Sequence, residues 1–283
     1  AYDLGYIGLL DLSTRLQATF DTLDKLDHYR GHLLNWYDTE TLAPLAPRYV
    51  STVDSGNLAG CLVVAEQACL AFPNALVLRP ERWQGLLDTL GLLEESLNNL
   101  YSNRVDRSVV SLQHFVTLLR EKIQDTVNLP LLWATRLATL NGADWEALSQ
   151  HIVAVFESGI APLNAENLVA LRITSERFHT HMTSMQRDME LFMPWLLPFS
   201  NPPALFVHTP AQSPLAIAWE DLLFVVPSSP PKLGELTTIC ESLSGYLNHL
   251  RAHLSLKDNS HTQMQEAISW CAQLQSNIDK TYT

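Results

Sequence analysis

Side chains able to hold or orient a ligand are concentrated in residues 32–57. The candidates are an aromatic pair, two carboxylates, a guanidinium and small polar groups: Trp36, Tyr37, Asp38, Arg48, Asp54, Ser55 and Asn57. Aromatic faces and carboxylates together suit a sugar, because the ring covers apolar C–H surface while the carboxylate accepts hydrogen bonds from hydroxyls. The stretch lacks helical period in an otherwise helical chain, which is typical of a binding loop on a rigid scaffold.

The first part of this loop has two interpretations. Trp36, Tyr37 and Asp38 could stack against a sugar ring and bind its hydroxyls. Alternatively, the two aromatic rings plug a hairpin against the core and Asp38 holds its turn by accepting backbone hydrogen bonds. The residues alone leave both interpretations open.

The second part of the loop is expected to begin a helix. Asp54 or Ser55 is the predicted N-cap, with Gly56 and Asn57 in the first turn. The exposed backbone N–H groups of such a helix start could bind a ligand oxygen, or the residues could cap the helix and do nothing more. Gly56 beside Asn57 is more than capping alone requires.

No metal or cofactor is predicted from the remaining titratable residues. His28 and His32 are four residues apart, as are His249 and His253, a spacing that can bind metal from one helix face. Gly31 interrupts the first pair, and neither pair has the glutamate of a zinc-protease motif. We interpret these histidines as solvated or core-edge residues.

Acidic pairs elsewhere do not form a recognisable catalytic motif. Glu94 with Glu95, and Asp188 with Glu190, are expected on solvated helix faces, whereas a glycosidase acid/base pair must face across a cleft. The sequence contains no glycine-rich phosphate loop and no nucleophile elbow.

Charge and composition restrict the kinds of partner. The 283 residues include 30 acidic and 18 basic side chains, a net charge of −12. This balance argues against nucleic acid, since no basic face is available to bind phosphates. The four cysteines have no CxxC spacing, and Cys61 and Cys69 are expected in a helix as small core residues. We also expect no membrane-spanning helix, because such a helix needs about 18 apolar residues and we identify no apolar run that approaches this length.

The elements that must position the loop are predicted to be helices. Residues 1–8 resemble the end of one helix, and another is expected from Asp11 or Ser13 to about Leu26. Pro44 and Pro47 force an extended crossing before the helix that opens near residue 54. The inward face of that helix is predicted to carry Leu58, Leu62, Ala65 and Cys69.

Leucine-rich helical patterns fill the rest of the chain. They start at Pro80 and recur over 109–123, 145–156, 164–197, 233–254 and 261–281. The predicted fold class is therefore all-α, with antiparallel helical hairpins and one small β-hairpin or irregular insert near residues 32–50.

Two segments of the chain carry a family resemblance. They are Arg30-Gly-His-Leu-Leu-Asn-Trp-Tyr-Asp-Thr39 and Pro47-Arg-Tyr-Val-Ser-Thr-Val-Asp-Ser-Gly-Asn-Leu-Ala-Gly60. With Ala1-Tyr-Asp-Leu-Gly-Tyr-Ile7 before them, they closely resemble the central region of cyclic β-1,2-glucan synthases. These are very large inner-membrane proteins that join a glycosyltransferase region, a glycoamylase-like glucan-cyclising region and a phosphorylase-like region.

The resemblance implies part of an (α/α) toroid that handles β-1,2-linked glucose chains. The implied partners are β-1,2-glucan or another glucose-based oligosaccharide and other domains of the same polypeptide. A partial toroid would also expose apolar helix faces, so self-association of the chain is expected. The acidic charge balance predicts no nucleic-acid partner. The implied location is the cytoplasmic face of the inner membrane, within a larger membrane protein. By position, the sugar cleft would be lined by Trp36, Tyr37, Asp38, Asp54, Ser55 and Asn57.

The resemblance also implies that the catalytic carboxylates lie in a segment C-terminal to this chain. A retaining transglycosylase needs two carboxyl groups about 5–5.5 Å apart. Asp38 and Asp54 are therefore predicted to bind or orient substrate, no catalytic residue is assigned, and the chain alone is expected to be inactive. An alternative is a non-catalytic helical module that docks on neighbouring domains of a large membrane glucan synthase, as its Met-rich long helix and Pro-rich linkers also allow.

These interpretations together predict four segments. Residues 1–75 would begin the toroid and carry the cleft loops, and residues 76–200 would be a helical insertion or continuation. Residues 201–232 would be Pro/Ser-rich linkers around a short apolar segment. Residues 233–283 would form a terminal helical hairpin.

Overall fold

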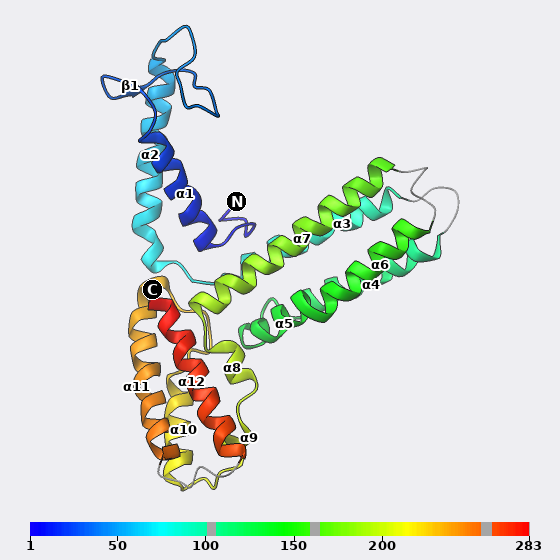
Figure 1. Ribbon diagram of the computed structural model, residues 1–283, viewed down its shortest axis with the longest axis vertical. Coiled ribbons are helices and arrows are strands. Elements are labelled where there is room, and N and C mark those ends of the chain that lie inside the picture. The colour runs from blue at the N-terminus through cyan, green and yellow to red at the C-terminus, as the bar shows by residue number, and fades with distance from the viewer. Residues whose placement is uncertain (101–105, 159–164, 256–261, 283) are drawn as a thin grey trace. The chain divides into compact units, whose positions relative to one another are not determined.

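The computed structural model describes residues 1–100, 106–158, 165–255 and 262–282 and is built almost entirely of helices (Figure 1). One two-stranded antiparallel sheet accompanies them in the described residues. The predicted all-α class with a small β-hairpin is thereby confirmed. The chain divides into two compact units: a smaller unit, Leu9–Ala75, and a larger unit made of Ala1–Gly8 and Leu76–Thr283.

The smaller unit contains two helices joined by a hairpin and an irregular loop. Its elements are α1 (Leu9–Leu23), β1 (His28–Tyr29), β2 (His32–Leu33), α2 (Thr52–Ala71) and the 3₁₀ turn η1 (Phe72–Asn74). His28 pairs with Leu33 and Tyr29 with His32 across the strands. The turn between them uses positive φ at Arg30 and Gly31, the conformation of a two-residue hairpin.

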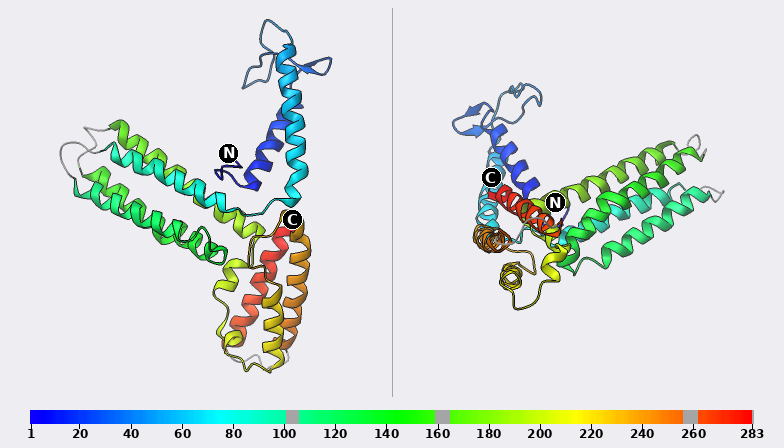
Figure 2. Two further views of the ribbon diagram at one scale, coloured as in Figure 1. Left: turned by 180° about the vertical axis from the view of Figure 1, so that it is seen from behind. Right: turned by 60° about the horizontal axis from the view of Figure 1, so that its bottom comes forward.

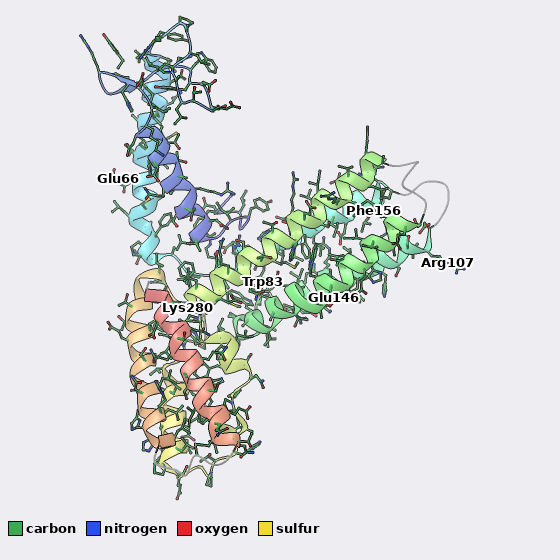
Figure 3. The ribbon with its side chains drawn as sticks, in the orientation of Figure 1. Glu66, Trp83, Arg107, Glu146, Phe156 and Lys280 are labelled. Carbon is green, nitrogen blue, oxygen red and sulfur yellow. The ribbon has the colours of Figure 1, made fainter. Side chains whose placement is uncertain are left out.

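Helix α2 has no buried residue. The predicted inward face was wrong: Leu62 and Cys69 are exposed, and Leu58 and Ala65 are only half-buried. Cys61, also expected in the core, is exposed. The helical pattern correctly indicated a helix, but nothing within the smaller unit covers it. Glu66 projects from the same helix in Figure 3.

The segment Thr52–Asn74 is the one described helix that is long and apolar enough to cross a membrane, at 23 residues. The expectation that no apolar run approaches this length was therefore wrong. The finding rests on length and composition alone, and one such helix is weak evidence because core helices of soluble proteins pass the same test.

The larger unit contains two groups of helices, one formed by α3 to α7 and the other by α10 to α12, and within each group the views of Figure 2 show the helices side by side. Its longer helices are α3 (Pro80–Asn98), α4 (Arg107–Gln124), α6 (Trp145–Glu157), α7 (Ala165–Phe192), α10 (Pro214–Val225), α11 (Leu236–Ser255) and α12 (Thr262–Tyr282). Its short elements are η2 (Pro130–Leu132), α5 (Trp133–Thr139), η3 (Leu140–Asp144), α8 (Leu196–Ser200), α9 (Ala204–Val207) and η4 (Leu233–Glu235). Helix α3 packs against α4 and α7, and α11 packs against α10 and α12.

The core of the larger unit follows the leucine spacing. Leu86, Leu90, Leu93 and Leu97 on α3 are buried together, as their recurrence at three and four residues predicted. The largest fully buried side chains include Trp83, Trp133 and Trp195. The two indoles of Trp83 and Trp133 lie with ring centroids 5.9 Å apart.

Helix α7 differs from its prediction in two ways. It ends at Phe192 rather than continuing to residue 197, since Pro194 cannot donate the next helical hydrogen bond. Asp188 was expected on a solvated face but is only 1% exposed, and its Oδ1 accepts a hydrogen bond from Arg187 Nη2 at 3.0 Å. Its neighbour Glu190 is exposed, as predicted.

The first eight residues form a turn against α3 rather than the predicted helix end. Arg82 Nη1 donates to the Gly5 carbonyl at 3.2 Å, and the Tyr6 hydroxyl donates to Asp88 at 3.2 Å. Gly5 has a φ of +77°, and a Cβ there would lie 1.9 Å from the Glu81 carbonyl oxygen. The close approach of backbone to α3 therefore requires glycine.

Candidate functional site

The loop between β2 and α2 is a second, irregular hairpin held by backbone hydrogen bonds. Asn35 N–H donates to the Tyr49 carbonyl and Leu45 N–H to the Trp36 carbonyl, each at 3.0 Å. Tyr37 and Pro44 form an isolated antiparallel bridge. The extended crossing that the prolines predicted is therefore one arm of this hairpin, and it returns the chain to the start of α2.

Asp38 holds the tip of the hairpin. Its Oδ1 accepts hydrogen bonds from the N–H of Thr41 at 2.7 Å, the Thr41 hydroxyl at 2.8 Å and the N–H of Glu40 at 3.0 Å. The Thr41 N–H, followed by its hydroxyl, lowers the pKa of Asp38 below its usual value. These contacts are those of the turn-holding interpretation. A role in ligand binding remains a prediction.

The aromatic pair is divided between two roles. The Tyr37 hydroxyl accepts from Leu34 N–H at 2.7 Å and donates to the Asp27 carbonyl at 2.6 Å, so both sides of its hydroxyl are occupied. Trp36 is 62% exposed. Tyr37 therefore fixes the hairpin, while Trp36 presents its ring to the surroundings. Arg48 also faces solvent and forms an ion pair with Asp27 at 3.3 Å.

Asn35 connects the hairpin to the start of α2. One of the two possible placements of its amide oxygen and nitrogen gives both atoms suitable hydrogen-bond partners. The amide nitrogen then donates to Asp54 Oδ2 at 3.0 Å, and the amide oxygen accepts from Trp36 Nε1 at 2.6 Å and the Tyr49 hydroxyl at 2.7 Å. Sequence reasoning missed Asn35, although it directly precedes Trp36 in the aperiodic stretch.

Helix α2 begins earlier than the sequence predicted, because Ser51 is its N-cap. The predicted cap at Asp54 or Ser55 was therefore wrong. The Ser51 hydroxyl oxygen accepts from the Asp54 N–H at 3.2 Å, so Asp54 is the third residue of the helix. A carboxylate in this first turn is favoured by the partial positive charge of the helix start. Ser55 and Asn57 follow within the helix, half-buried and exposed respectively.

The structure brings together Trp36, Tyr49 and Asp54 around Asn35. Exposed aromatic rings, a carboxylate and an amide on one framework can bind a polyhydroxylated ligand. The network contributes one carboxylate, whereas glycoside chemistry needs two facing each other. Asp38 belongs to the turn at the hairpin tip and is not part of this network.

The described residues include no group of three or more His, Cys, Asp or Glu side chains that could hold a metal ion. His28 and His32 lie on neighbouring strands rather than on one helix face. His249 and His253 lie on α11 with their Nε2 atoms 3.3 Å apart.

Comparison with known proteins finds no matching family model. Over 111 residues, 37% of this chain, the sequence is 45% identical to the cyclic beta-(1,2)-glucan synthase NdvB of Rhizobium meliloti (strain 1021). The matched stretch covers 4% of that protein, so the chain spans a small part of the length of the relative it matches. The similarity agrees with the resemblance carried by the loop motifs.

Proposed function

We propose that this chain is part of a carbohydrate-active protein of β-1,2-glucan synthesis and that it contributes a substrate-binding loop. The observation that carries the proposal is the 45% identity over 111 residues to a cyclic β-1,2-glucan synthase. In this proposal the smaller unit begins an (α/α) toroid. The parent protein lies in the inner membrane, with this region on its cytoplasmic face.

The hydrogen-bond network supports particular roles for the loop residues. Trp36 is the stacking surface, because its indole N–H is fixed by Asn35 while its ring stays exposed. The Asp54 carboxylate accepts one hydrogen bond from Asn35, and its remaining acceptor sites bind sugar hydroxyls. Arg48, Ser55 and Asn57 form the rim. Tyr37 and Asp38 position the hairpin.

The proposal assigns no catalytic step to this chain alone. The second carboxylate of a transglycosylase would come from elsewhere in the parent protein, because the network around Asn35 holds only Asp54. The expected activity of the chain is therefore binding without hydrolysis or cyclisation.

Calorimetric titration with linear β-1,2-gluco-oligosaccharides tests the loop. Trp36→Ala and Asp54→Asn should each weaken binding at least about tenfold, a loss of about 1.4 kcal/mol. Tyr29→Ala removes an aromatic ring that is also exposed in the smaller unit but lies outside the network, so its affinity should match the wild type. Unchanged affinity in both loop variants would remove the loop from the site.

A second candidate function is a helical module that docks on other domains of the same polypeptide. The exposed apolar surface of α2 favours it, since a contiguous apolar surface of this kind normally lies against protein or membrane. Exposed residues along it include Val53, Leu62, Val63, Val64 and Leu70. A protein partner fits better than lipid, because a carboxylate such as that of Glu66 would cost about 2.5–3.5 kcal/mol at a bilayer centre.

Sedimentation tests the docking module. Without its partner, the exposed α2 should cause the chain to self-associate as concentration rises. The double substitution Val64→Glu and Leu70→Glu should restore a monomer, whereas Val169→Glu, on an exposed position of α7, should not. A wild-type chain that stays monomeric at high concentration would contradict the module, and flotation with lipid vesicles would favour the membrane instead.

A further inference from the structure

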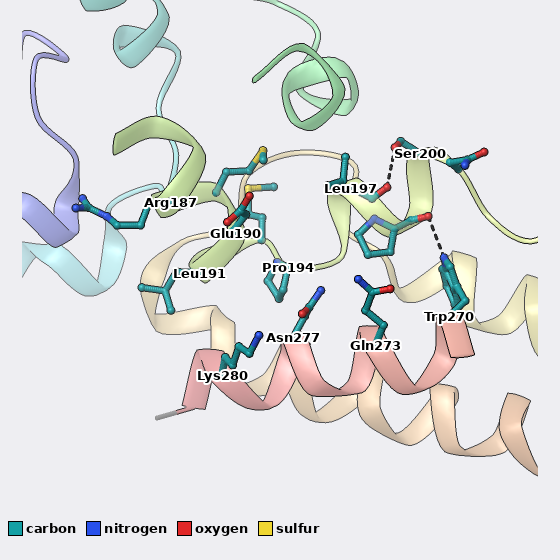
Figure 4. Close-up of a pocket in the computed structure, with 14 residues that line it drawn as sticks. Arg187, Glu190, Leu191, Pro194, Leu197, Ser200, Trp270, Gln273, Asn277 and Lys280 are labelled. Atoms are coloured by element: carbon teal, nitrogen blue, oxygen red, sulfur yellow. Dashed lines mark hydrogen bonds between the residues drawn. The ribbon is translucent and has the colours of Figure 1, made fainter. Parts of the chain in front are cut away.

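A groove of about 660 Å³ lies between α12 and the chain around the end of α7 and α8, wholly within the larger unit. This volume is in the range of small-ligand sites, about 300–1,000 Å³. Figure 4 shows Trp270, Gln273, Asn277 and Lys280 along one face of α12, directed toward the segment that carries Pro194 and Leu197.

The apolar part of the groove is preformed. Met189 and Met193 are almost completely buried beneath it. The Trp270 indole N–H donates to the Pro198 carbonyl at 3.2 Å, and the Trp270 ring stands edge-on to Phe199 at 5.2 Å. The wall is therefore fixed, and a ligand needs to order little of the protein when it binds.

Three carboxamides supply the polar part of the groove. Asn201, Gln273 and Asn277 line it, and none of their side chains hydrogen-bonds another residue in the part of the chain that the structure describes. Each carboxamide both donates and accepts. A hydroxyl group also does both, so several amides around an apolar floor match a ligand that carries many hydroxyls.

The charges at the groove do not select an ion. Arg187 Nη2 donates to the buried carboxylate of Asp188 at 3.0 Å. Glu190 accepts from Gln186 at 2.7 Å. The lining holds the cations Arg187 and Lys280 and the anion Glu190, and the buried Asp188 carboxylate behind it is paired with Arg187, so the charges in and next to the groove balance. This balance favours a neutral ligand over an anion.

We propose that this groove is a second carbohydrate site, which binds a short neutral gluco-oligosaccharide through Gln273 and Asn277. The polyhydroxylated class follows from the lining, while the choice of a β-1,2-linked glucan rests on the proposed function. The groove shares no residue with the loop around Asn35, so each site can be removed without the other.

Calorimetric titration of the whole chain with sophorose, the β-1,2-linked glucose disaccharide, and with longer linear β-1,2-gluco-oligosaccharides tests the groove. The measurement is made both with Trp36 intact and in the Trp36→Ala background, where the loop site is disabled. The double substitution Gln273→Leu and Asn277→Leu should weaken the remaining binding at least about tenfold. Gln265→Leu makes the same change at an exposed position of α12 outside the groove and should leave the affinity unchanged.

The outcomes separate the two proposals. Binding that Trp36→Ala abolishes and the groove substitutions leave intact would overturn the groove and support the loop. Binding that only the groove substitutions weaken would support the groove and remove the loop. No binding of any of these sugars would also overturn the groove inference.

Discussion

The two units of this chain contain similar apolar helices but use them differently. In the larger unit, α3 packs against α4 and α7, and its Leu86, Leu90 and Leu93 are buried in the core. In residues 9–75, all of which the structure describes, only Leu9 and Leu34 are buried. The motif-bearing loop therefore lies on the part of the chain that has almost no core of its own. The larger unit therefore has a core of its own, whereas α2 of the smaller unit is uncovered.

The largest expected difference between the units is in cysteine reactivity. Burial raises the pKa of Cys240 to about 11 and that of Cys271 to about 12, whereas Cys61 and Cys69 are exposed on α2. At pH 8, iodoacetamide should modify the two exposed thiols about a hundredfold faster, because the thiolate is the reacting form.

Mass spectrometry of labelled peptides over time measures these rates. Denatured protein, in which all four thiols should react alike, is the control. Equal labelling rates for all four cysteines in the native protein would contradict the difference in burial between the two units. Slow labelling of Cys61 and Cys69 would show that α2 is already covered.

A matched pair of leucine substitutions, one in each unit, should show the next largest difference. Leu90→Ala removes a fully buried side chain from α3 and should lower the free energy of unfolding by about 2–5 kcal/mol. Leu62→Ala makes the same change at an exposed position of α2 and should cost about 0.5 kcal/mol or less. Urea denaturation followed by circular dichroism measures both, and similar losses would contradict an uncovered α2.

The smallest expected effect is a loosening of the hairpin tip in acid. Since hydrogen bonds from Thr41 lower the pKa of Asp38 in the folded state, their stabilisation is present above the unfolded pKa and is lost as the pH falls through the lower, folded value. The Thr41 amide signal in NMR should therefore titrate below pH 3.8. Thr41→Val should move that midpoint upward, and an unchanged midpoint would show that the Thr41 hydroxyl does not hold the carboxylate.

Leucine spacing predicted the helices of the larger unit well, because each apolar stripe finds its partner within the chain. The same pattern failed for α2, since periodicity shows which residues could be buried and does not show what buries them. The cap of α2 was misplaced because Ser51, Asp54 and Ser55 are all good capping residues, and residue type alone does not distinguish them.

The site was only partly visible in the sequence. Trp36 and Asp54 were identified from their residue types, whereas Asn35 was missed because an amide that joins three neighbours has no periodic signature. Gln273 and Asn277 were missed for a related reason. Amides spaced four apart on a helix are typical of an ordinary solvated face. They line a groove here because the segment between α7 and α8 packs opposite them.

The docking of residues 1–8 on α3 has a consequence for how the chain can be rearranged. Because Ala1–Gly8 and Leu76 both belong to the larger unit, residues 9–75 form an inserted domain, with both of its ends fixed in one host. Inserted domains can often be shortened, exchanged or removed without unfolding the host, provided that the entry and exit points are preserved. Arg82 and Tyr6 hold the entry point, so the loop and its binding residues could be replaced as a cassette while the larger unit stays folded.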